Sequence, residues 1–585
     1  MALNEQKRNA IIEYNNNVTK NREIMKRYID VVCFLATQEL AFRGHDESVS
    51  SINRGNYIES LKLLSLYDGA LNTFQENATV FTGVSSHIQN DLIESVANVV
   101  LQSIKLEISE CLFIAILLDE TSDVSNKSQL SSVVRLVTKS GQIVERFLGY
   151  TDVSSDRTAN RISKHVLNIM ETYGCGSKLI AQTYDGAAVM SGELNGTQAK
   201  VREVYPKVFF IHCFAHVLNL VLSQSVSYIK ECKIFFAAIS GISKFFSHST
   251  KRLDALQNII KLKLPNAAPT RWNYNSRIVN AVFQHREDLI TFFEEIVEHP
   301  ENWDKDAILS AGGFLNFLTD FSTIFLLNTF NVIFAHTDIL YNILQNKYFE
   351  INYCVDKINE IKQIISNFRE EFTTVFEKTI INTGLPKIKR NLKTQEDINQ
   401  YFKALFYEII DTISIQMSAR YENLKCLHFV EVLNNKKYIE YKKIFPQKAF
   451  DALKLTYGDI FDTVRLTNEL IVLYTSTQLH DKPIFELFNY LKDGDLIEVF
   501  PEIFKLCALI ITIPYTTASV ERTFSTLKRV KTYPRNTISE DRLSALSMLS
   551  IEQQQLKILK SNSDFYNNVI DIFAKKNRRI NLIYK

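Results

Sequence analysis

The sequence has no pair of cysteines at the spacing that a zinc finger needs. Its eight cysteines are scattered along 585 residues, and no two of them are separated by only two residues. A structural zinc site of the two-Cys, two-His type therefore cannot be assembled from local spacing, and we predict no structural zinc. Scattered cysteines also favour a reducing compartment, cytosol or nucleus, over a disulfide scaffold.

The sequence also lacks an excess of either charge and a secretory signal. Lys and Arg total 67 against 65 Asp and Glu, so any nucleic-acid binding must come from local patches such as the basic tail "KKNRRINLIYK". The start of the chain, "MALNEQKRNAIIEY", is polar where a signal peptide is apolar. The longest uncharged run, residues 321–336, contains Asn, Thr, Ser and His, which indicates a buried helix and no membrane partner.

Glycine is scarce, with only 17 residues, which agrees with an α-rich protein. Apolar residues recur at helical spacing from residue 4 to about residue 110, for example at Leu92, Val96 and Val99. Long helical patterns return from about residue 272 to about residue 500. The sequence therefore predicts a helical leader and a second, larger helical block.

Between these blocks the pattern changes to short apolar strands. Residues 112–118 are seven apolar residues in a row, as expected of a strand buried on both faces. "SQLSSVVRLV" and "IVERFLGYTDV" flank the turn-like "TKSGQ" and predict a hairpin, and a helical pattern, the strand "SKLIAQTY" and the strand "KVFFIH" follow. This order predicts an α+β fold with a mixed sheet covered by helices, the order used by ribonuclease-H-like nucleases.

Two aspartates follow strands that this topology places side by side. Asp119 follows the first strand and Asp185 follows the fourth, so we expect the two carboxylates to approach one another. Phosphodiester chemistry uses two divalent ions about 4 Å apart, and Mg²⁺ prefers hard carboxylate oxygens. Most aspartates at strand ends are caps or turn formers, however, so spacing alone gives this interpretation little weight.

Five stretches of the sequence together resemble the hAT transposase superfamily. They are "LLDETSDVSNKSQLSSVVRLV", "AQTYDGAAVMSG", "IHCFAHVLNLVLSQS", "PTRWNYNS" and "TTASVERTFSTLKRVKTYPRNTISEDRLSALSMLSIE". The match is closest to the animal branch that includes domesticated zinc finger MYM-type and transcription-factor-II-I-repeat proteins. The leader, with "FRGHDES" and "NRGNYIESLKLLSLYD", also resembles that branch.

The resemblance implies a set of catalytic roles. The family's acidic triad falls on Asp119, Asp185 and Glu521, which would hold two Mg²⁺ or Mn²⁺ ions. Thr516 and Thr517 are candidate N-caps for a helix that begins close to Glu521. The implied reaction is metal-dependent cleavage of DNA followed by strand transfer.

The resemblance also implies a domain organisation. We expect a leader at residues 1–110, the first part of a ribonuclease-H-like core at 111–270, a large all-helical insertion at 271–500, and a C-terminal dimerisation region at 501–585 that completes the core. The apolar side chains of this last region would pack between subunits or onto the insertion: Phe524, Leu527, Leu543, Leu546 and Leu549.

Two residue pairs match further family motifs. Arg271 and Trp272 match an Arg-Trp pair that would contact DNA, since an indole stacks on an unpaired base and an arginine holds a phosphate. One of only two tryptophans in a chain is usually a core residue, and this alternative stays open. Cys213 and His216 match a Cys-x-x-His motif that would shape the floor near the triad or contact DNA beside the cut.

Two hypotheses remain open at this stage. In the first, the protein is a nuclear transposase that cleaves DNA, because all three acids are present. In the second, it is a catalytically silent, domesticated dimer that regulates transcription through DNA or protein partners. The second is favoured by the absence of a cysteine pair for the zinc-binding domain with which active members usually recognise transposon ends.

Overall fold

The computed structural model describes residues 2–260, 273–386, 394–479 and 482–585, and the chain divides into two compact units. The sheet unit comprises Met1–His212, Val464–Val472 and Ile484–Lys585, and the helical unit comprises Cys213–Thr463 and Leu473–Pro483. The predicted leader and core therefore share one unit, and the helical unit begins at Cys213 rather than near residue 271.

All five predicted strands are present and form one mixed sheet. They are β1 (Ile114–Ser122), β2 (Ser128–Val137), β3 (Ile143–Asp152), β4 (Leu179–Tyr184) and β5 (Phe209–His212). Their order is β3-β2-β1-β4-β5, with the first three strands antiparallel and β1, β4 and β5 parallel. The first and fourth strands are neighbours, as the sequence predicts. One detail differs: Asp119 lies within β1, which continues for three more residues.

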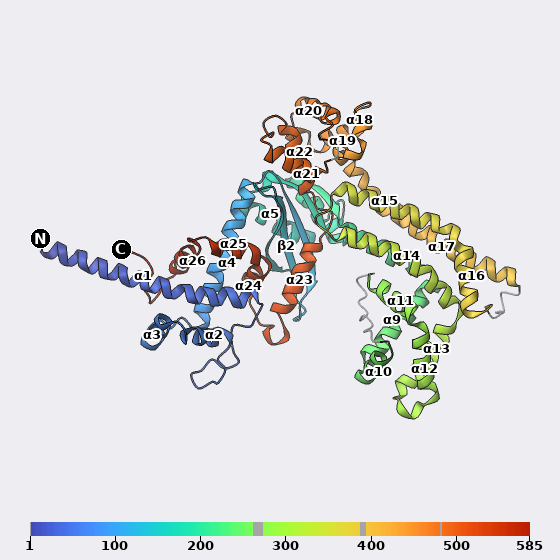
Figure 1. Ribbon diagram of the computed structural model, residues 1–585, viewed down its shortest axis with the longest axis horizontal. Helices are drawn as coiled ribbons and strands as arrows, with labels where there is room; N and C mark the ends of the chain where they lie inside the picture. Colours follow the sequence, from blue (N-terminus) through green and yellow to red (C-terminus); the bar gives the residue numbers. More distant parts are fainter. Residues whose placement is uncertain (1, 261–272, 387–393, 480–481) are drawn as a thin grey trace. The chain divides into compact units, whose positions relative to one another are not determined.

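The helices of the sheet unit precede, cover and follow this sheet (Figure 1). They are α1 (Ala2–Thr37), α2 (Asn56–Ser65), α3 (Gly69–Asn77), α4 (Ser86–Glu110), α5 (Ala159–Tyr173), α6 (Ala188–Ser191), α7 (Thr197–Val204), α21 (Ile484–Asp493), α22 (Pro501–Thr512), α23 (Ala518–Val530), α24 (Glu540–Ile551), α25 (Gln553–Ser561) and α26 (Phe565–Ala574).

Alternate residues of β2 contact helices on opposite faces of the sheet. The Ser131 hydroxyl is hydrogen-bonded to the Thr523 hydroxyl of α23 at 2.8 Å. The next residue, Ser132, is hydrogen-bonded to His165 of α5 at 2.9 Å. Because successive side chains of a strand point to opposite faces, α23 covers one face and α5 the other.

The outer strand β3 is covered along its open edge by the C-terminal helices. Ser544 of α24 accepts a hydrogen bond from the backbone N–H of Tyr150, and Glu552 accepts one from the N–H of Phe147. Arg146 of β3 also forms salt bridges with Glu552 and with Glu107 of α4. An uncovered edge strand would present unpaired backbone groups to other chains, and these side chains satisfy them.

Two glycines explain the repeated Arg-Gly motif of the leader. Gly44 and Gly55 hold the two ends of the loop at residues 43–55 in backbone contact, and Gly55 has a φ of 94°. A Cβ at Gly55 would lie 2.1 Å from the backbone nitrogen of Gly44, so only glycine fits there.

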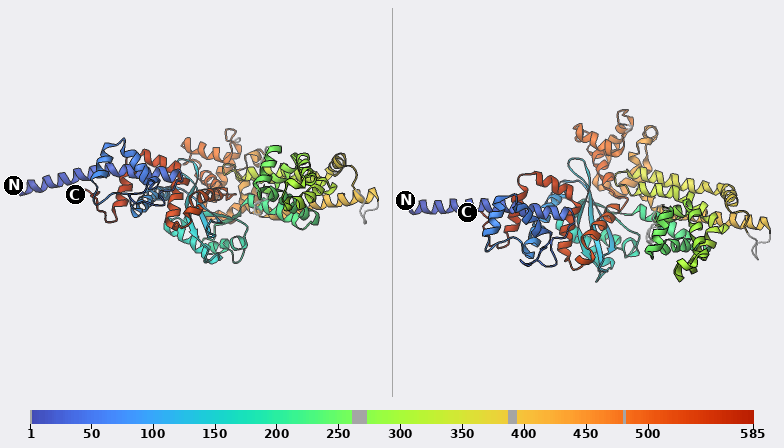
Figure 2. Two further views of the ribbon diagram at one scale, coloured as in Figure 1. Left: turned by 90° about the horizontal axis from the view of Figure 1, so that it is seen from below. Right: turned by 60° about the horizontal axis from the view of Figure 1, so that its bottom comes forward.

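The two ends of the sheet unit are bound to each other. Asn21 donates a hydrogen bond to the carbonyl oxygen of Asn581, and Arg22 donates one to that of Leu582. In both views of Figure 2 the C-terminus lies beside α1. Two cations of the basic tail, Lys576 and Arg578, form salt bridges with Asp91 of α4, so part of that tail is already neutralised.

The helical unit has a core built largely of phenylalanine rings. Its helices are α8 (Phe214–Ser227), α9 (Lys230–Ser247), α10 (Thr250–Ile260), α11 (Asn273–Gln284), α12 (Arg286–Glu298), α13 (Lys305–Thr319), α14 (Phe321–Leu344), α15 (Ile351–Asn367), α16 (Phe372–Thr383), α17 (Gln395–Arg420), α18 (Tyr438–Tyr441) and α19 (Gln447–Tyr457), and α20 (Thr463–Thr475) crosses both units. By length and composition α14 could span a membrane, but 67% of its most apolar window is buried in the protein, as in a core helix.

Candidate functional site

The first two predicted acids meet at one level of the sheet. β1 and β4 run parallel with Leu117 opposite Thr183, and Asp119 and Asp185 each follow two residues later. Neighbouring strands lie about 4.8 Å apart, so the register makes the two aspartates neighbours. Both side chains are partly buried.

The same register places Asp119 on the face that α23 covers. Asp119 lies opposite Ser131, and directly opposed residues of an antiparallel pair point to the same face. Ser131 is hydrogen-bonded to Thr523 of α23. On the neighbouring strand, the Thr183 hydroxyl donates to the carbonyl oxygen of Pro514, in the loop that leads into α23.

Glu521 lies in the first turn of α23, on this face of the sheet. The helix begins at Ala518, earlier than the sequence predicts, and the hydroxyl of Thr516, one residue before the N-cap, accepts from the Ala518 N–H. The predicted cap Thr517 makes no such bond with its side chain. Tyr150 of β3 also donates to the carbonyl oxygen of Thr523 at 2.6 Å, so α23 is hydrogen-bonded to two strands just after Glu521.

The C-terminal end of α23 is held by a buried ion pair that the sequence analysis missed. Lys531 and Asp123 approach to 2.5 Å, and their side chains are only 3% and 1% exposed. Asp123 also accepts from the backbone N–H groups of Ser125 and Lys127. Burial raises the pKa of the Asp123 carboxyl, but Lys531 and these N–H groups outweigh it and hold the pKa below its usual value. The available signal was the second aspartate of "DETSD", which is Asp123.

The three acids suit a hard divalent cation by their chemistry, and they share one face of the sheet. In the described part of the chain, however, no group of three or more His, Cys, Asp or Glu side chains is close enough together to hold a metal ion. Asp185 instead accepts from the N–H of Ala187, and Asp119 accepts from the N–H of Glu120. Metal binding would therefore have to bring the three carboxylates closer together.

None of the other four predicted DNA contacts belongs to the described part of the sheet unit. Arg271 and Trp272 lie outside the described residues. Cys213 is the first residue of the helical unit, fully buried at the start of α8, whereas the acids belong to the sheet unit. Tyr421 donates to the carbonyl oxygen of Phe214; burial raises its pKa well above the usual value, and nearby Cys213 adds to this shift. His216 is partly buried on the same helix, and DNA contact by this pair stays a prediction.

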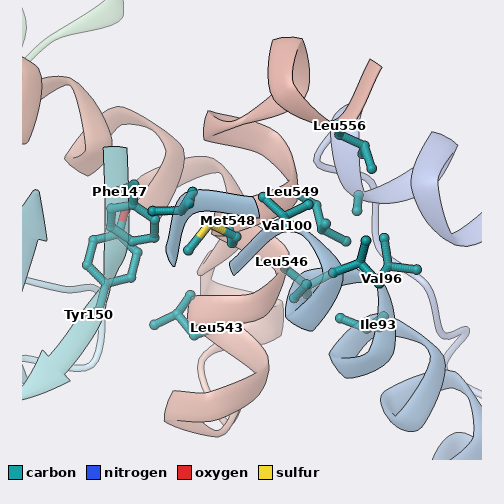
Figure 3. Close-up of a cluster of buried hydrophobic side chains, with 14 of the residues drawn as sticks. Ile93, Val96, Val100, Phe147, Tyr150, Leu543, Leu546, Met548, Leu549 and Leu556 are labelled. Carbon is teal, nitrogen blue, oxygen red and sulfur yellow. The ribbon is translucent and has the colours of Figure 1, made fainter. Parts of the chain in front are cut away.

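The predicted dimerisation residues lie in the core of their own chain. In Figure 3, Leu546 and Leu549 of α24 face Ile93, Val96 and Val100 of α4. Together with Phe524, Leu527 and Leu543 they are at most 7% exposed. In this arrangement they stabilise the fold of a single chain, and the side chains are not presented to a second subunit.

Two family models match this chain, and both matches lie largely in the sheet unit. Residues 2–196 match a family model described as "ZMYM1/FAM200, RNase-like domain", and residues 469–555 match one described as "hAT family C-terminal dimerisation region". The first match contains Asp119 and Asp185, and the second contains Glu521.

Two curated relatives cover most of the chain at low identity. The human "52 kDa repressor of the inhibitor of the protein kinase" is 21% identical over 91% of this chain and 74% of its own length. The mouse protein of the same name is 21% identical over 94% of this chain and 77% of its own length. The resemblance to hAT transposases is thereby confirmed: the chain is similar to an RNase-like domain over residues 2–196 and to a hAT C-terminal dimerisation region over residues 469–555.

Proposed function

We propose that this chain is a transposase-derived nuclease whose acidic face binds two Mg²⁺ or Mn²⁺ ions and cleaves DNA. The observation that carries the proposal is the shared placement of three acids: Asp119 in β1, Asp185 directly after the adjacent parallel strand β4, and Glu521 on the helix that covers this face. When bound, the ions would activate the attacking oxygen and stabilise the leaving oxygen. Strand transfer by a 3′-hydroxyl would use the same site.

The contribution of the protein itself is to position the third acid. Glu521 belongs to a segment more than 330 residues beyond Asp185 in the sequence, so local structure cannot place it. The hydrogen bonds from Ser131 and Tyr150 to Thr523 fix α23 across the sheet just after its first turn. The Lys531–Asp123 pair fixes its other end. Together these contacts restrict how α23 lies on the sheet, and with it the position of Glu521.

The test is cleavage of supercoiled plasmid in the presence of Mn²⁺. We expect the wild type to nick the plasmid and Asp185→Ala to lose at least about 100-fold in rate, since even outer-shell partners of metal ligands cost 10–100-fold. Asp541→Ala is the matched control, because Asp541 is an exposed aspartate of α24. Thermal unfolding of the three proteins shows whether a lost activity reflects misfolding. Identical products from wild type and Asp185→Ala would contradict the nuclease proposal.

A second function is favoured by a separate observation. The described acids do not form a ready metal cluster, and both curated relatives are named as repressors. The alternative proposal is a nuclear, catalytically silent repressor that retains the acids by descent and acts through DNA or protein partners. It predicts that reporter repression survives Asp185→Ala unchanged.

Both proposed functions include self-association of the chain. The match to a hAT dimerisation region supports a homodimer or larger assembly. Because Leu543, Leu546 and Leu549 are buried within one chain, the subunit contact would use other residues of that region. Light scattering of the intact protein measures the number of subunits.

We also propose that the helical unit is an all-α insertion in a ribonuclease-H-like fold.

A further inference from the structure

The helix that carries the third acid has an outer stripe that is not used in folding. α-Helices have 3.6 residues per turn, so residues four and seven positions after Glu521 share its side of α23. These residues are Ser525 and Lys528, and both are exposed. The stripe therefore passes from a partly buried carboxylate to a hydroxyl and then to an ammonium group.

Two of the cations at the end of α23 have structural partners, whereas Lys528 has no ion-pair partner in the described part of the chain. Arg529 forms a salt bridge with Glu39, and Lys531 forms the buried pair with Asp123. Within the described residues Lys528 makes no salt bridge, and the same holds for the exposed Arg522 beside Glu521. Of the four cations on α23 and its C-cap residue, two are therefore paired within the fold. The other two, Arg522 and Lys528, are exposed to solvent on the helix that carries Glu521.

An exposed aromatic ring lies in the turn that follows α23. Tyr533 is 82% exposed, in the turn after α23, and this turn is held next to the β1–β2 turn by a hydrogen bond from Ser125 to the carbonyl oxygen of Asn536. An exposed tyrosine gains no stability from burial. It does offer a flat face on which an unpaired base can stack.

We propose that Ser525, Lys528 and Tyr533 form a binding track for one DNA strand that leads away from the acidic face. Lys528 lies about 10 Å from Glu521 along the helix axis, from seven residues at 1.5 Å each, which is one to two phosphate spacings of an extended strand. Lys528 and Ser525 bind phosphate oxygens, and Tyr533 stacks on an unpaired base. The role of this track in guiding DNA to the acids rests on the proposed nuclease function. Binding of DNA to the track does not require that the protein cleaves it.

The test measures binding of full-length protein to a fluorescent single strand and to its duplex, without divalent metal and over a range of salt concentrations. We expect Lys528→Gln to weaken both by roughly three- to tenfold and to reduce the slope of log affinity against log salt by about one, as for a lost phosphate contact. Lys528→Arg keeps the charge and restores both values. Lys557→Gln, which removes an exposed lysine of α25, is the matched control.

Tyr533 is tested by selectivity rather than by affinity alone. We expect Tyr533→Ala to weaken single-strand binding about 5- to 100-fold with a much smaller effect on the duplex, because only an unpaired base exposes its face. Tyr533→Phe keeps the ring and the affinity, and Tyr67→Ala is the control at an equally exposed tyrosine of the leader (87% exposed).

The outcomes separate this inference from the proposed function. Equal effects of Lys528→Gln and Lys557→Gln, or an unchanged single-strand affinity in Tyr533→Ala, overturn the track even if the wild type nicks plasmid. Selective loss of binding in both track variants supports the track even if the plasmid is never nicked, in which case the nuclease proposal fails alone.

Discussion

In the sheet unit, Lys531 and Asp123 form an ion pair whose side chains are at most 3% exposed, whereas the helical unit has stacked phenylalanines in its interior. A second ion pair of the sheet unit, Arg135–Glu145, is at most 4% exposed. The rings of the helical unit lie with centroids about 5 to 6 Å apart and come from α9, α14, α16 and α17: Phe235, Phe236, Phe330, Phe334, Phe321, Phe325, Phe372, Phe376, Phe402 and Phe406.

The difference follows how each unit is assembled. The sheet unit is built from three separate segments, and its polar contacts join residues about 400 positions apart. A buried ion pair tolerates little displacement, so it specifies how α23 lies on the sheet, at a cost in desolvation. Apolar rings pack in many arrangements at similar energy. The sheet unit, whose segments lie far apart in the sequence, therefore includes buried ion pairs, and the smaller helical unit relies on dispersion and apolar burial.

The largest expected effect is on the buried pair. Lys531→Met leaves Asp123 buried without its cation, which should lower the free energy of unfolding of the sheet unit by about 3–5 kcal/mol. Urea-dependent proteolysis, with fragments assigned by mass to each unit, measures this value. The helical unit should keep its stability.

The control for Lys531→Met is the double variant Lys531→Met, Asp123→Asn. It removes the uncompensated charge while keeping an acceptor for the N–H groups of Ser125 and Lys127. We expect it to be more stable than Lys531→Met alone. If the two were equally unstable, packing rather than charge would hold α23.

The next effect is a pH dependence confined to the sheet unit. Burial lowers the pKa of His165 to about 4, with a smaller contribution from Arg161. An unfolded histidine titrates near 6.5, so between pH 6.5 and 4 the unfolded state binds more protons and stability falls as the pH falls. The full effect is about 3 kcal/mol.

His165→Gln should remove that part of the pH dependence, because glutamine can still bond to Ser132 but does not titrate. Urea midpoints of the sheet unit at pH 7 and pH 5 give the measurement. If wild type and His165→Gln showed the same change in midpoint between these pH values, the lowered pKa of His165 would be contradicted.

The strands and the level of Asp119 and Asp185 could be predicted, because an apolar run and the order of strands and helices are local properties of the sequence. The position of α23 could not, because it depends on contacts such as Ser131–Thr523, between residues 392 positions apart. The same limit applies to α24. Periodicity indicates that Leu543, Leu546 and Leu549 are buried, but it does not say whether the covering surface is α4 or a second subunit.

The smallest expected change in stability concerns a polar pair in the aromatic core of the helical unit. The Asn328 amide of α14 donates to the Thr379 hydroxyl of α16 at 3.0 Å, and both residues are buried. Thr379→Val should cost about 1–2 kcal/mol, because it leaves a buried donor without its acceptor. Replacing both partners, as Asn328→Leu with Thr379→Val, should restore most of this stability, since apolar groups of similar shape suit a core of rings. Urea-dependent proteolysis of the helical unit compares the two variants, and a double variant less stable than Thr379→Val would mean that this unit, too, depends on a buried polar contact for its packing.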